Sequence, residues 1–268
     1  VASQLVTDRR VAFFSFIGSA KVGWMLRSQL ASGTRCALEH GGAAPVIIAQ
    51  DADLDDTLPL IAKGGFYHAG QVCVSVQRVF AHRSIARQVA EKLAELGSKM
   101  SIGDPILESS LIGPLIRPRE VMRVHNWVTD AIAEGAECLV GGELNSDTSY
   151  QSTVLFEPSH QSKVSQLEIF GPVICVYAYD DIDEAIARAN SLDVAFQASV
   201  LTSSIDIAMH CYTQLNASAV MVNDHTAYRV DWMPFAGLKQ SGLGVGGIPY
   251  TYEDMQIEKM MLLRSKAL

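Results

Sequence analysis

The sequence predicts an α/β fold built mostly around a parallel sheet. Short apolar runs of strand length alternate with longer stretches in which apolar residues recur at helical spacing, and this alternation continues along most of the chain. It is typical of strand–helix–strand units, whose helices cover the faces of a parallel sheet. The length of 268 residues is enough for one large domain or two small ones, and 49% hydrophobic residues are ordinary for a globular protein.

The first predicted unit is a strand, a tight turn and a helix. Residues 10–16 are apolar and rich in aromatic side chains, which predicts a buried strand. Gly18 and Ser19 follow, and a helix is predicted over about 21–31. Free backbone N–H groups and the helix dipole favour a phosphate at such a turn. The simpler interpretation is that Gly-Ser serves the geometry of the turn alone.

The rest of the chain continues the alternation. Strands are predicted over 46–49, 78–82, 138–140, 153–156, 172–179, 198–201 and 219–223. Helices are predicted over 54–67, from an N-cap at Ser84 to about Gly97, over 120–134, from Asp181 onward, and over 204–215. Residues 141–152 are predicted to form a surface loop.

Cys73 follows a Gly-Gln turn and precedes an apolar run, so its thiol would lie on a loop held by rigid neighbours. A lone cysteine is more often a small buried hydrophobe. However, residues 66–78 resemble the nucleophile segment of the aldehyde dehydrogenase superfamily, F-x-N-x-G-Q-x-C-x-x-x-x-R. His68 stands where that pattern often has asparagine.

A second motif supports this resemblance. Residues 38–45 resemble the family's general-base motif E-L-G-G-K-x-P, and Glu39 matches its glutamate. His40 and Ala43 depart from the usual leucine and lysine. The separation of 73 − 39 = 34 positions fits the family's spacing. The alternative for Glu39 is a solvated or capping carboxylate.

The resemblance also implies a nicotinamide cofactor, NAD or NADP. Residues 16–23 are similar to F-T-G-S-x-x-x-G, which implies that Gly18 and Ser19 contact the dinucleotide, with Val22 as a further candidate. Residues 166–173 resemble E-x-F-G-P-V, which implies that Glu168 holds the nicotinamide ribose and that Phe170 lies beside it. An exposed carboxylate before a strand is the alternative for Glu168.

The aldehyde is expected to lie near a third motif. Residues 233–242 resemble P-F-G-G-x-K-x-S-G, which implies that Phe235 lines the aldehyde tunnel. Arg229 could hold an anionic group of the aldehyde, or simply pair at the surface. Residues 242–247 formally fit G-x-G-x-x-G, but no strand leads into them and Pro249 stands where a helix should open, so we reject a nucleotide fingerprint there.

These motifs together predict oxidation of an aldehyde to a carboxylic acid with NAD or NADP, through a Cys73 thiohemiacetal and thioester. Glu39 would activate the water that hydrolyses the thioester. One alternative is a coenzyme A-acylating enzyme of the same superfamily, against which Glu39 argues. Another is a truncated, non-catalytic module that binds ligands or oligomerises.

The resemblance predicts three parts. Residues 1–41 would be the C-terminal remnant of a dinucleotide-binding domain, 42–247 the catalytic domain, and 248–268 a C-terminal return with an oligomerisation strand at 260–264. The chain opens in mid-pattern, so we expect a fragment that is inactive alone, because a dinucleotide crevice needs further strands. A homo-oligomer, dimer or tetramer, is the expected assembly.

Composition narrows the partners. The net charge of −8, without any Lys/Arg cluster, argues against nucleic acid or an anionic membrane surface. No apolar run reaches the length of a membrane span. Five scattered cysteines without C-x-x-C or metal-ligand spacing predict free thiols, no metal site and a cytoplasmic location.

Overall fold

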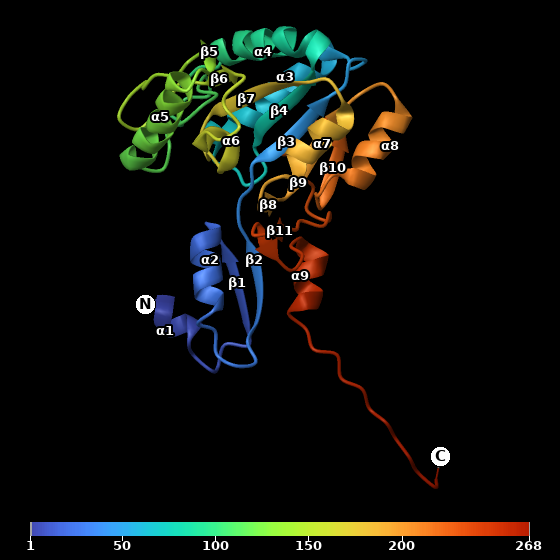
Figure 1. The fold of residues 1–268 in the computed structure, drawn as a ribbon. Helices are drawn as coiled ribbons and strands as arrows, with labels where there is room; N and C mark the ends of the chain where they lie inside the picture. The colour runs from blue at the N-terminus through green and yellow to red at the C-terminus, as the bar shows by residue number, and fades with distance from the viewer. Residues whose placement is uncertain (1, 268) are drawn as a thin grey trace.

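A computed structural model describes residues 2–267, and its largest element is a seven-stranded sheet of order β10-β9-β3-β4-β7-β6-β5 (Figure 1). Every neighbouring pair is parallel except β5–β6. The strands are β3 (Ala44–Ile48), β4 (Val76–His82), β5 (Glu137–Val140), β6 (Thr153–Phe156), β7 (Val173–Tyr179), β9 (Gln197–Leu201) and β10 (Ala219–Val222). The predicted, mostly parallel α/β fold is therefore confirmed.

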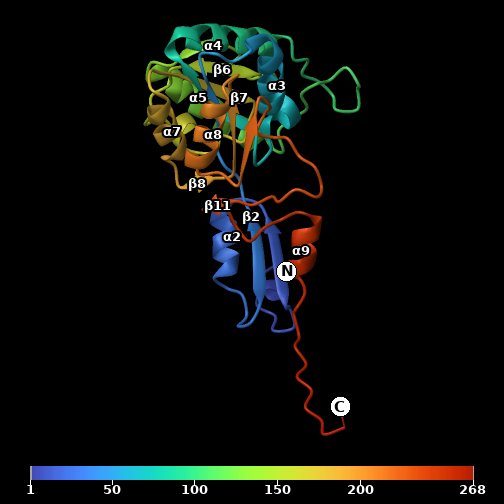
Figure 2. The ribbon, with the colours of Figure 1, turned by 90° about the vertical axis from the view of Figure 1, so that its right-hand side faces the viewer.

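Helices cover both faces of this sheet and bury its core. They are α3 (Leu54–Phe66), α4 (Arg83–Ser98), α5 (Pro118–Ala133), α6 (Lys163–Gln166), α7 (Ile182–Asn190) and α8 (Ile205–Gln214). Helices α3 and α4 pack together, whereas α7 and α8 lie on the opposite side of the sheet from α3 (Figure 2). The core between them contains fully buried Leu58, Phe66 and Leu93.

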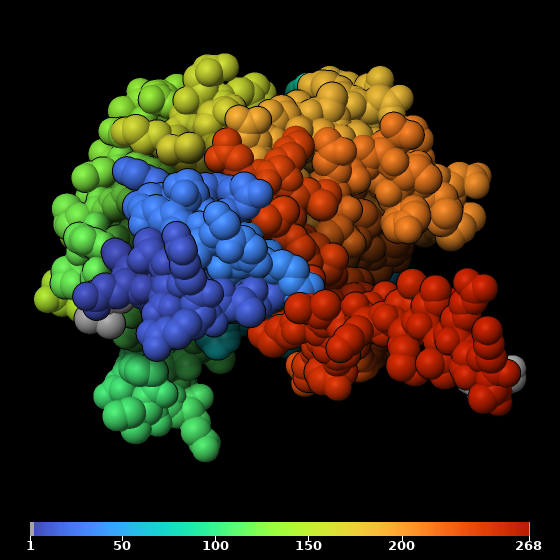
Figure 3. Space-filling view, turned by 90° about the horizontal axis from the view of Figure 1, so that it is seen from below, coloured from blue at the N-terminus to red at the C-terminus, as the bar shows by residue number. Residues whose placement is uncertain are grey.

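A smaller sheet of order β1-β2-β12 forms a second body. Its strands are β1 (Phe13–Ile17), β2 (Arg35–Glu39) and β12 (Gly242–Leu243), beside the helices α1 (Ala2–Val6), α2 (Ala20–Arg27) and α9 (Ile248–Asp254). A short ribbon of β8 (Val194–Ala195) and β11 (Leu238–Lys239) lies between the two bodies. Because β12 pairs with β2, segments from both ends of the chain lie side by side (Figure 3).

The carboxyl ends of β1 and β2 in the small sheet face the amino ends of the parallel strands in the large sheet. Gly18 follows the carboxyl end of β1, and Glu39 is the last residue of β2. On the other side, the amino ends of β4 and β7 face the junction, and Cys73 and Glu168 precede these strands. We call this junction the seam. The residues singled out by the motifs gather there.

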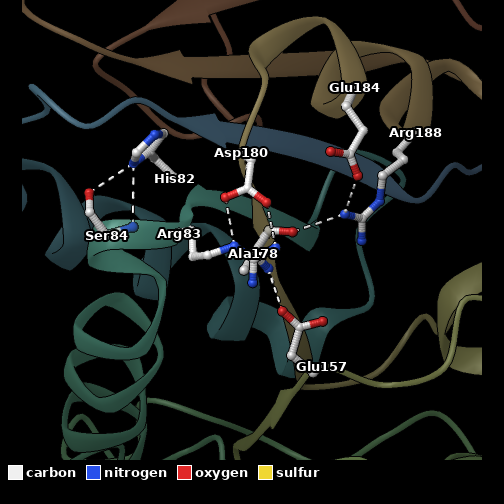
Figure 4. A network of polar contacts seen from close by, with 8 residues as sticks. All are labelled: His82, Arg83, Ser84, Glu157, Ala178, Asp180, Glu184 and Arg188. Atoms are coloured by element: carbon white, nitrogen blue, oxygen red, sulfur yellow. Dashed lines mark hydrogen bonds and ion pairs between the residues drawn. The ribbon is translucent and has the colours of Figure 1, made fainter.

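Ion pairs lie at the carboxyl ends of β4 and β7, on the side of the large sheet away from the seam (Figure 4). Arg83, at the start of α4, makes two bonds of 2.6 and 2.7 Å to Asp180, just after β7. Both side chains are more than half exposed. Exposed pairs of this kind contribute about 1 kcal/mol or less to stability, so the network orders this edge without dominating the fold.

The structure corrects several predicted elements. Strand β1 was expected to be buried, yet Ile17 is 75% exposed, because within residues 2–267 one face of the small sheet is poorly covered. The helix after it ends at Arg27 rather than near residue 31. His82, not Ser84, caps α4, since its Nδ1 accepts from the Ser84 N–H.

Three further differences concern segments near the ends of the chain. Strand β2, which carries Glu39, was not predicted. Helix α9 begins at Ile248, with Pro249 in its first turn. Proline has no N–H, but at this position the N–H would have no partner within the helix. The prediction that Pro249 prevents a helix from opening here was therefore wrong. Residues 256–267 form no strand, because no neighbouring strand among the described residues is available to pair with 260–264. The predicted role of that segment in oligomerisation stays a prediction.

None of the helices within residues 2–267 has the length and apolar character needed to cross a membrane.

Candidate active site

A left-handed turn presents Cys73. His68, Ala69 and Gly70 all have positive φ, of 51°, 55° and 70°, directly after helix α3. At Gly70 a side chain is excluded as well, since a Cβ would overlap the carbonyl oxygen of Gly171. The turn therefore packs backbone to backbone against the segment that follows Glu168. Cys73 lies half-buried three residues later, before β4.

The surroundings of Cys73 disfavour its thiolate in the chain by itself. The pKa of the Cys73 thiol is raised to about 11, chiefly by burial and in addition by the carboxylates of Glu168 and Glu39. A backbone hydrogen bond and Arg229 lower the pKa. The structure thus places both predicted carboxylates within electrostatic reach of the predicted nucleophile.

Glu39 reaches the seam from the end of β2. Its backbone is fixed on both sides, by pairing with Ile17 and with Gly242, and its carbonyl accepts from the Gly18 N–H at 3.1 Å. Its carboxylate lies over Gly246, where a Cβ would overlap Oε1. Burial raises the pKa of Glu39, and the positive charge of Arg229 opposes this shift.

Glu168 lies on the loop between α6 and β7. Its Oε1 accepts a hydrogen bond from the Gly42 N–H at 3.1 Å, and a Cβ at Gly41 would overlap both carboxylate oxygens. Burial raises the pKa of Glu168 to about 7, while the Gly42 bond and Arg123 lower it. Phe170 follows in an exposed position with φ of 49°, so its ring faces outward from a backbone conformation that is unfavourable for a bulky residue.

The β1–α2 turn is exposed at the same seam. Gly18 and Ser19 are both exposed, and Ser19 is the N-cap of α2 without a side-chain capping bond. Its hydroxyl and the first N–H groups of the helix are therefore free for a polar ligand. Val22 is 39% exposed one turn into the helix.

Phe235 and Arg229 form one wall beside Cys73. Phe235 is 8% exposed and packs against Phe196, with ring centroids 4.6 Å apart, in a small apolar cluster that Cys73 borders. The Arg229 guanidinium lies 4.6 Å from the centroid of the Phe235 ring. Its Nη1 donates to the carbonyls of Val230 and Met233, so the exposed guanidinium is held over the ring.

Comparison with known proteins identifies the family to which the chain belongs. Residues 1–261 match the aldehyde dehydrogenase family. The chain belongs to this family. A 3-sulfolactaldehyde dehydrogenase from Priestia aryabhattai is 38% identical over 263 residues, which are 98% of this chain and 55% of that protein. The chain therefore spans about half the length of this curated relative.

Solved aldehyde dehydrogenase structures have the same fold. One is glyceraldehyde-3-phosphate dehydrogenase GapN from Methanocaldococcus jannaschii complexed with NADP, with a TM-score of 0.91, 33% identity, and coverage of 95% of this chain and 55% of that one. Another is aldehyde dehydrogenase 21 from Physcomitrella patens in complex with the product succinate, with a TM-score of 0.91, 32% identity, and coverage of 95% and 53%.

The sequence motifs did not point to several residues that surround Cys73. Phe196 belongs to the apolar cluster beside Cys73 and Tyr67 packs against that cluster, but no local pattern distinguishes them from core residues. His40 is buried, and its Nδ1–H bonds the Gln240 carbonyl at 2.9 Å, which also accepts from Trp24 Nε1 at 3.1 Å. This departure from the family motif thus holds the end of β2 to the segment between β11 and β12. Among residues 2–267 no cluster of His, Cys, Asp or Glu suits a metal ion.

Proposed function

We propose that this chain carries the chemical centre of an NAD(P)-dependent aldehyde dehydrogenase that converts an aldehyde to a carboxylic acid. One observation carries the proposal: Cys73, Glu39 and Glu168 come from three separate elements and meet at one seam. Nucleophile and base at this junction, beside an apolar wall, are what aldehyde oxidation through a thioester requires.

In the proposed reaction the Cys73 sulfur bonds to the aldehyde carbon. The resulting oxyanion accepts a hydrogen bond from the Cys73 backbone N–H, and losing one such donor typically costs ~10²–10³ in rate. Bound NAD(P) would supply the acceptor for the hydride that leaves this carbon. A thioester remains on Cys73, and Glu39 takes a proton from the water that attacks it, releasing the carboxylic acid and the thiol.

The cofactor side of the proposal rests on four residues. Gly18 and the uncapped Ser19 offer N–H and O–H donors to phosphate, and the partly buried Glu168 offers a carboxylate to ribose hydroxyls. Phe170 follows Glu168 with an exposed ring that could lie beside the nicotinamide. The NADP complex of the M. jannaschii relative supports a dinucleotide here; the choice between NAD and NADP belongs to the experiment below.

We further propose that the aldehyde carries an anionic group bound by Arg229. This guanidinium is exposed above Phe235 and acts electrostatically on both Cys73 and Glu39. Its two hydrogen bonds both start from Nη1, which leaves donors for a sulfonate, carboxylate or phosphate. The names of the relatives, with sulfolactaldehyde, succinate and glyceraldehyde 3-phosphate, support this substrate class.

A second candidate function is a non-catalytic module that binds ligands or oligomerises. The high pKa of Cys73, about 11, favours it, because little thiolate exists near neutral pH. Exposed apolar residues on β1 and on the tail at 257–263 would serve contacts between copies. Sedimentation of the purified chain would test the proposed homo-oligomer.

The five free cysteines fit the reducing cytoplasm that we propose as the location of the chain.

The test is NAD(P)H formation, measured with the purified chain and with a longer protein that carries it. We expect no turnover by the chain alone, because a dinucleotide crevice needs further strands. In the longer protein we expect turnover with aldehydes that bear an anionic group, little with neutral aldehydes of the same size, and none in Cys73→Ala. Arg229→Gln should reduce turnover of the anionic aldehydes selectively. Turnover that survives Cys73→Ala would refute the nucleophile. No turnover of any aldehyde in the longer protein would favour the binding module, and a product that requires coenzyme A would favour the acylating alternative.

A further inference from the structure

A buried glutamine lies at the start of β4, between Val76 and Arg78. Gln77 is 4% exposed, and both the nitrogen and the oxygen of its side-chain amide form hydrogen bonds to one loop. Nε2 donates to the carbonyls of Val164 at 3.0 Å and Leu167 at 2.8 Å, and Oε1 accepts from the Ile169 N–H at 2.9 Å. Leu167 and Ile169 are the two neighbours of Glu168, so Gln77 fixes the peptide groups on both sides of that residue.

Other contacts hold the same loop to the nucleophile turn. Arg123 Nη2 donates to the Ile169 carbonyl at 2.7 Å, and Gly70 packs its backbone directly on Gly171. Because Gln77 lies four positions after Cys73 in the chain, 77 − 73 = 4, the strand that leads away from Cys73 also carries the anchor of Glu168. Among these contacts, the Gln77 amide is the one that binds the peptide groups on both sides of Glu168.

A second glutamine provides a natural comparison. Gln71, two positions before Cys73, uses the same geometry on another loop: Nε2 donates to the Pro114 carbonyl at 3.2 Å and Oε1 accepts from the Ile116 N–H at 2.9 Å. Its Nε2 also donates to the His68 carbonyl at 3.2 Å. The residue between its two loop partners is Leu115, which has no charge. Gln71 therefore makes a similar anchor that holds no ionisable group.

We propose that Gln77 is a positioning residue that fixes the Glu168 carboxylate beside the Cys73 thiol. The proposal rests on the proposed function in treating Cys73 as the nucleophile. The groups that act on Cys73 are Glu168, Glu39 and Arg229, and Tyr67 also faces it. Of the two carboxylates, Glu168 exerts the larger effect on the thiol. Gln77 holds the flanking peptides of Glu168, and the Gly42 N–H holds the carboxylate itself, so the two contacts together keep it beside Cys73.

The test is the pH dependence of Cys73 alkylation by iodoacetamide, followed at this cysteine by mass spectrometry. Methionine at position 77 keeps the approximate volume but removes all three hydrogen bonds, so the backbone around Glu168 can shift and only the Gly42 N–H still holds its carboxylate. We expect the alkylation midpoint of Gln77→Met to fall by roughly one pH unit, the size of a neighbouring like charge. Glu168→Gln should lower it similarly, and the double variant should show no additional shift.

Gln71→Met is the matched control. Any shift it produces should be the same with Glu168 and with Glu168→Gln, because it acts on the turn and not on the carboxylate. An unchanged midpoint in Gln77→Met, or the same shift in the Glu168→Gln background, would overturn the proposal. If circular dichroism shows that Gln77→Met is unfolded, Gln77→Asn, which keeps the amide but shortens its reach, should shift the midpoint in the same direction by less; no shift there overturns it too.

Alkylation requires neither aldehyde nor dinucleotide. The failure of this experiment would therefore leave the proposed oxidation standing. Conversely, an inactive chain in the NAD(P)H assay would leave the relation between Gln77, Glu168 and Cys73 open to the same measurement.

Discussion

Replacing Gly246 by alanine should displace the carboxylate of Glu39 without changing Glu39 itself. Gly246 is buried and pairs with Phe235 through two backbone hydrogen bonds, of 3.0 and 2.7 Å. Its φ is not positive, so its backbone suits alanine. A methyl group there would overlap Oε1 of Glu39 and lie 3.0 Å from the Phe235 carbonyl oxygen. The carboxylate is the part that can yield.

The size of the effect follows from that overlap. Ordinary contacts begin at about 3.5 Å, so the carboxylate has to retreat by roughly 1 Å or more. A misplacement of about 1 Å costs ~10²-fold in rate, and a general base as a whole contributes ~10²–10⁴-fold. We therefore expect hydrolysis of a Cys73 thioester to slow by ~10²-fold. The close approach to Phe235 should also reduce stability by about 1–3 kcal/mol.

The assay is loss of an acetyl group from Cys73 after reaction with 4-nitrophenyl acetate, measured by mass spectrometry. Gly42→Ala is the control, since its methyl would meet Phe196 Cβ at 3.5 Å and the Cys73 carbonyl at 3.7 Å, which are ordinary contacts. Glu39→Gln gives the rate without the base. Wild-type hydrolysis in Gly246→Ala, or additional slowing when it is combined with Glu39→Gln, would refute this reasoning.

Three further predictions concern stability. Burial raises the pKa of Glu168 from 4.5 to about 7, so the folded chain holds this proton more tightly than the unfolded chain; the free energy of unfolding should fall by up to ~3 kcal/mol as pH rises through this range. Urea titrations at about pH 5 and pH 8 should show the loss, and Glu168→Gln should abolish it. Asp180→Asn breaks an exposed ion pair and should cost about 1 kcal/mol or less, with the difference disappearing in high salt; a larger loss that survives salt contradicts the surface assignment. Phe66→Ala empties a fully buried site and should cost about 3–5 kcal/mol by urea titration, whereas a loss below about 1 kcal/mol would show that the core collapses around it.

Local patterns predicted the large sheet well, because each of its strands is a short apolar run next to an amphipathic helix. The small sheet was harder to predict. Strand β2 has charged residues at both ends, and it is a strand because β1 and the distant β12 pair with it. The exposure of β1 depends on which other segments cover it, and the residues of β1 alone do not predict that. Likewise, residues 260–264 have the composition of a strand but lack a partner among the described residues.

The candidate site, like the fold, was only partly predictable from local sequence patterns. Cys73, Glu39 and Glu168 were named from short motifs, and the structure brings them together, although their roles stay predictions. Gln77 shows what such motifs miss. Its three partners lie 87 to 92 positions away, so the sequence shows a polar residue within a strand but does not show what that residue holds. His40 was noticed merely as a departure from a motif, whereas its contact with Gln240 depends on a segment 200 positions away.

The seam divides the proposed machinery between two bodies of unequal stability. Glu39 belongs to the small three-stranded sheet, while Cys73 and Glu168 belong to the large one with the extensive core. Small sheets with little buried surface open first when a protein is heated. Warming should therefore stop thioester hydrolysis while the thiol still reacts, so that acyl groups accumulate on Cys73. Cooling would refold the small sheet, return Glu39 to the seam and allow hydrolysis of the accumulated acyl groups. The loss of turnover on warming would therefore be reversible.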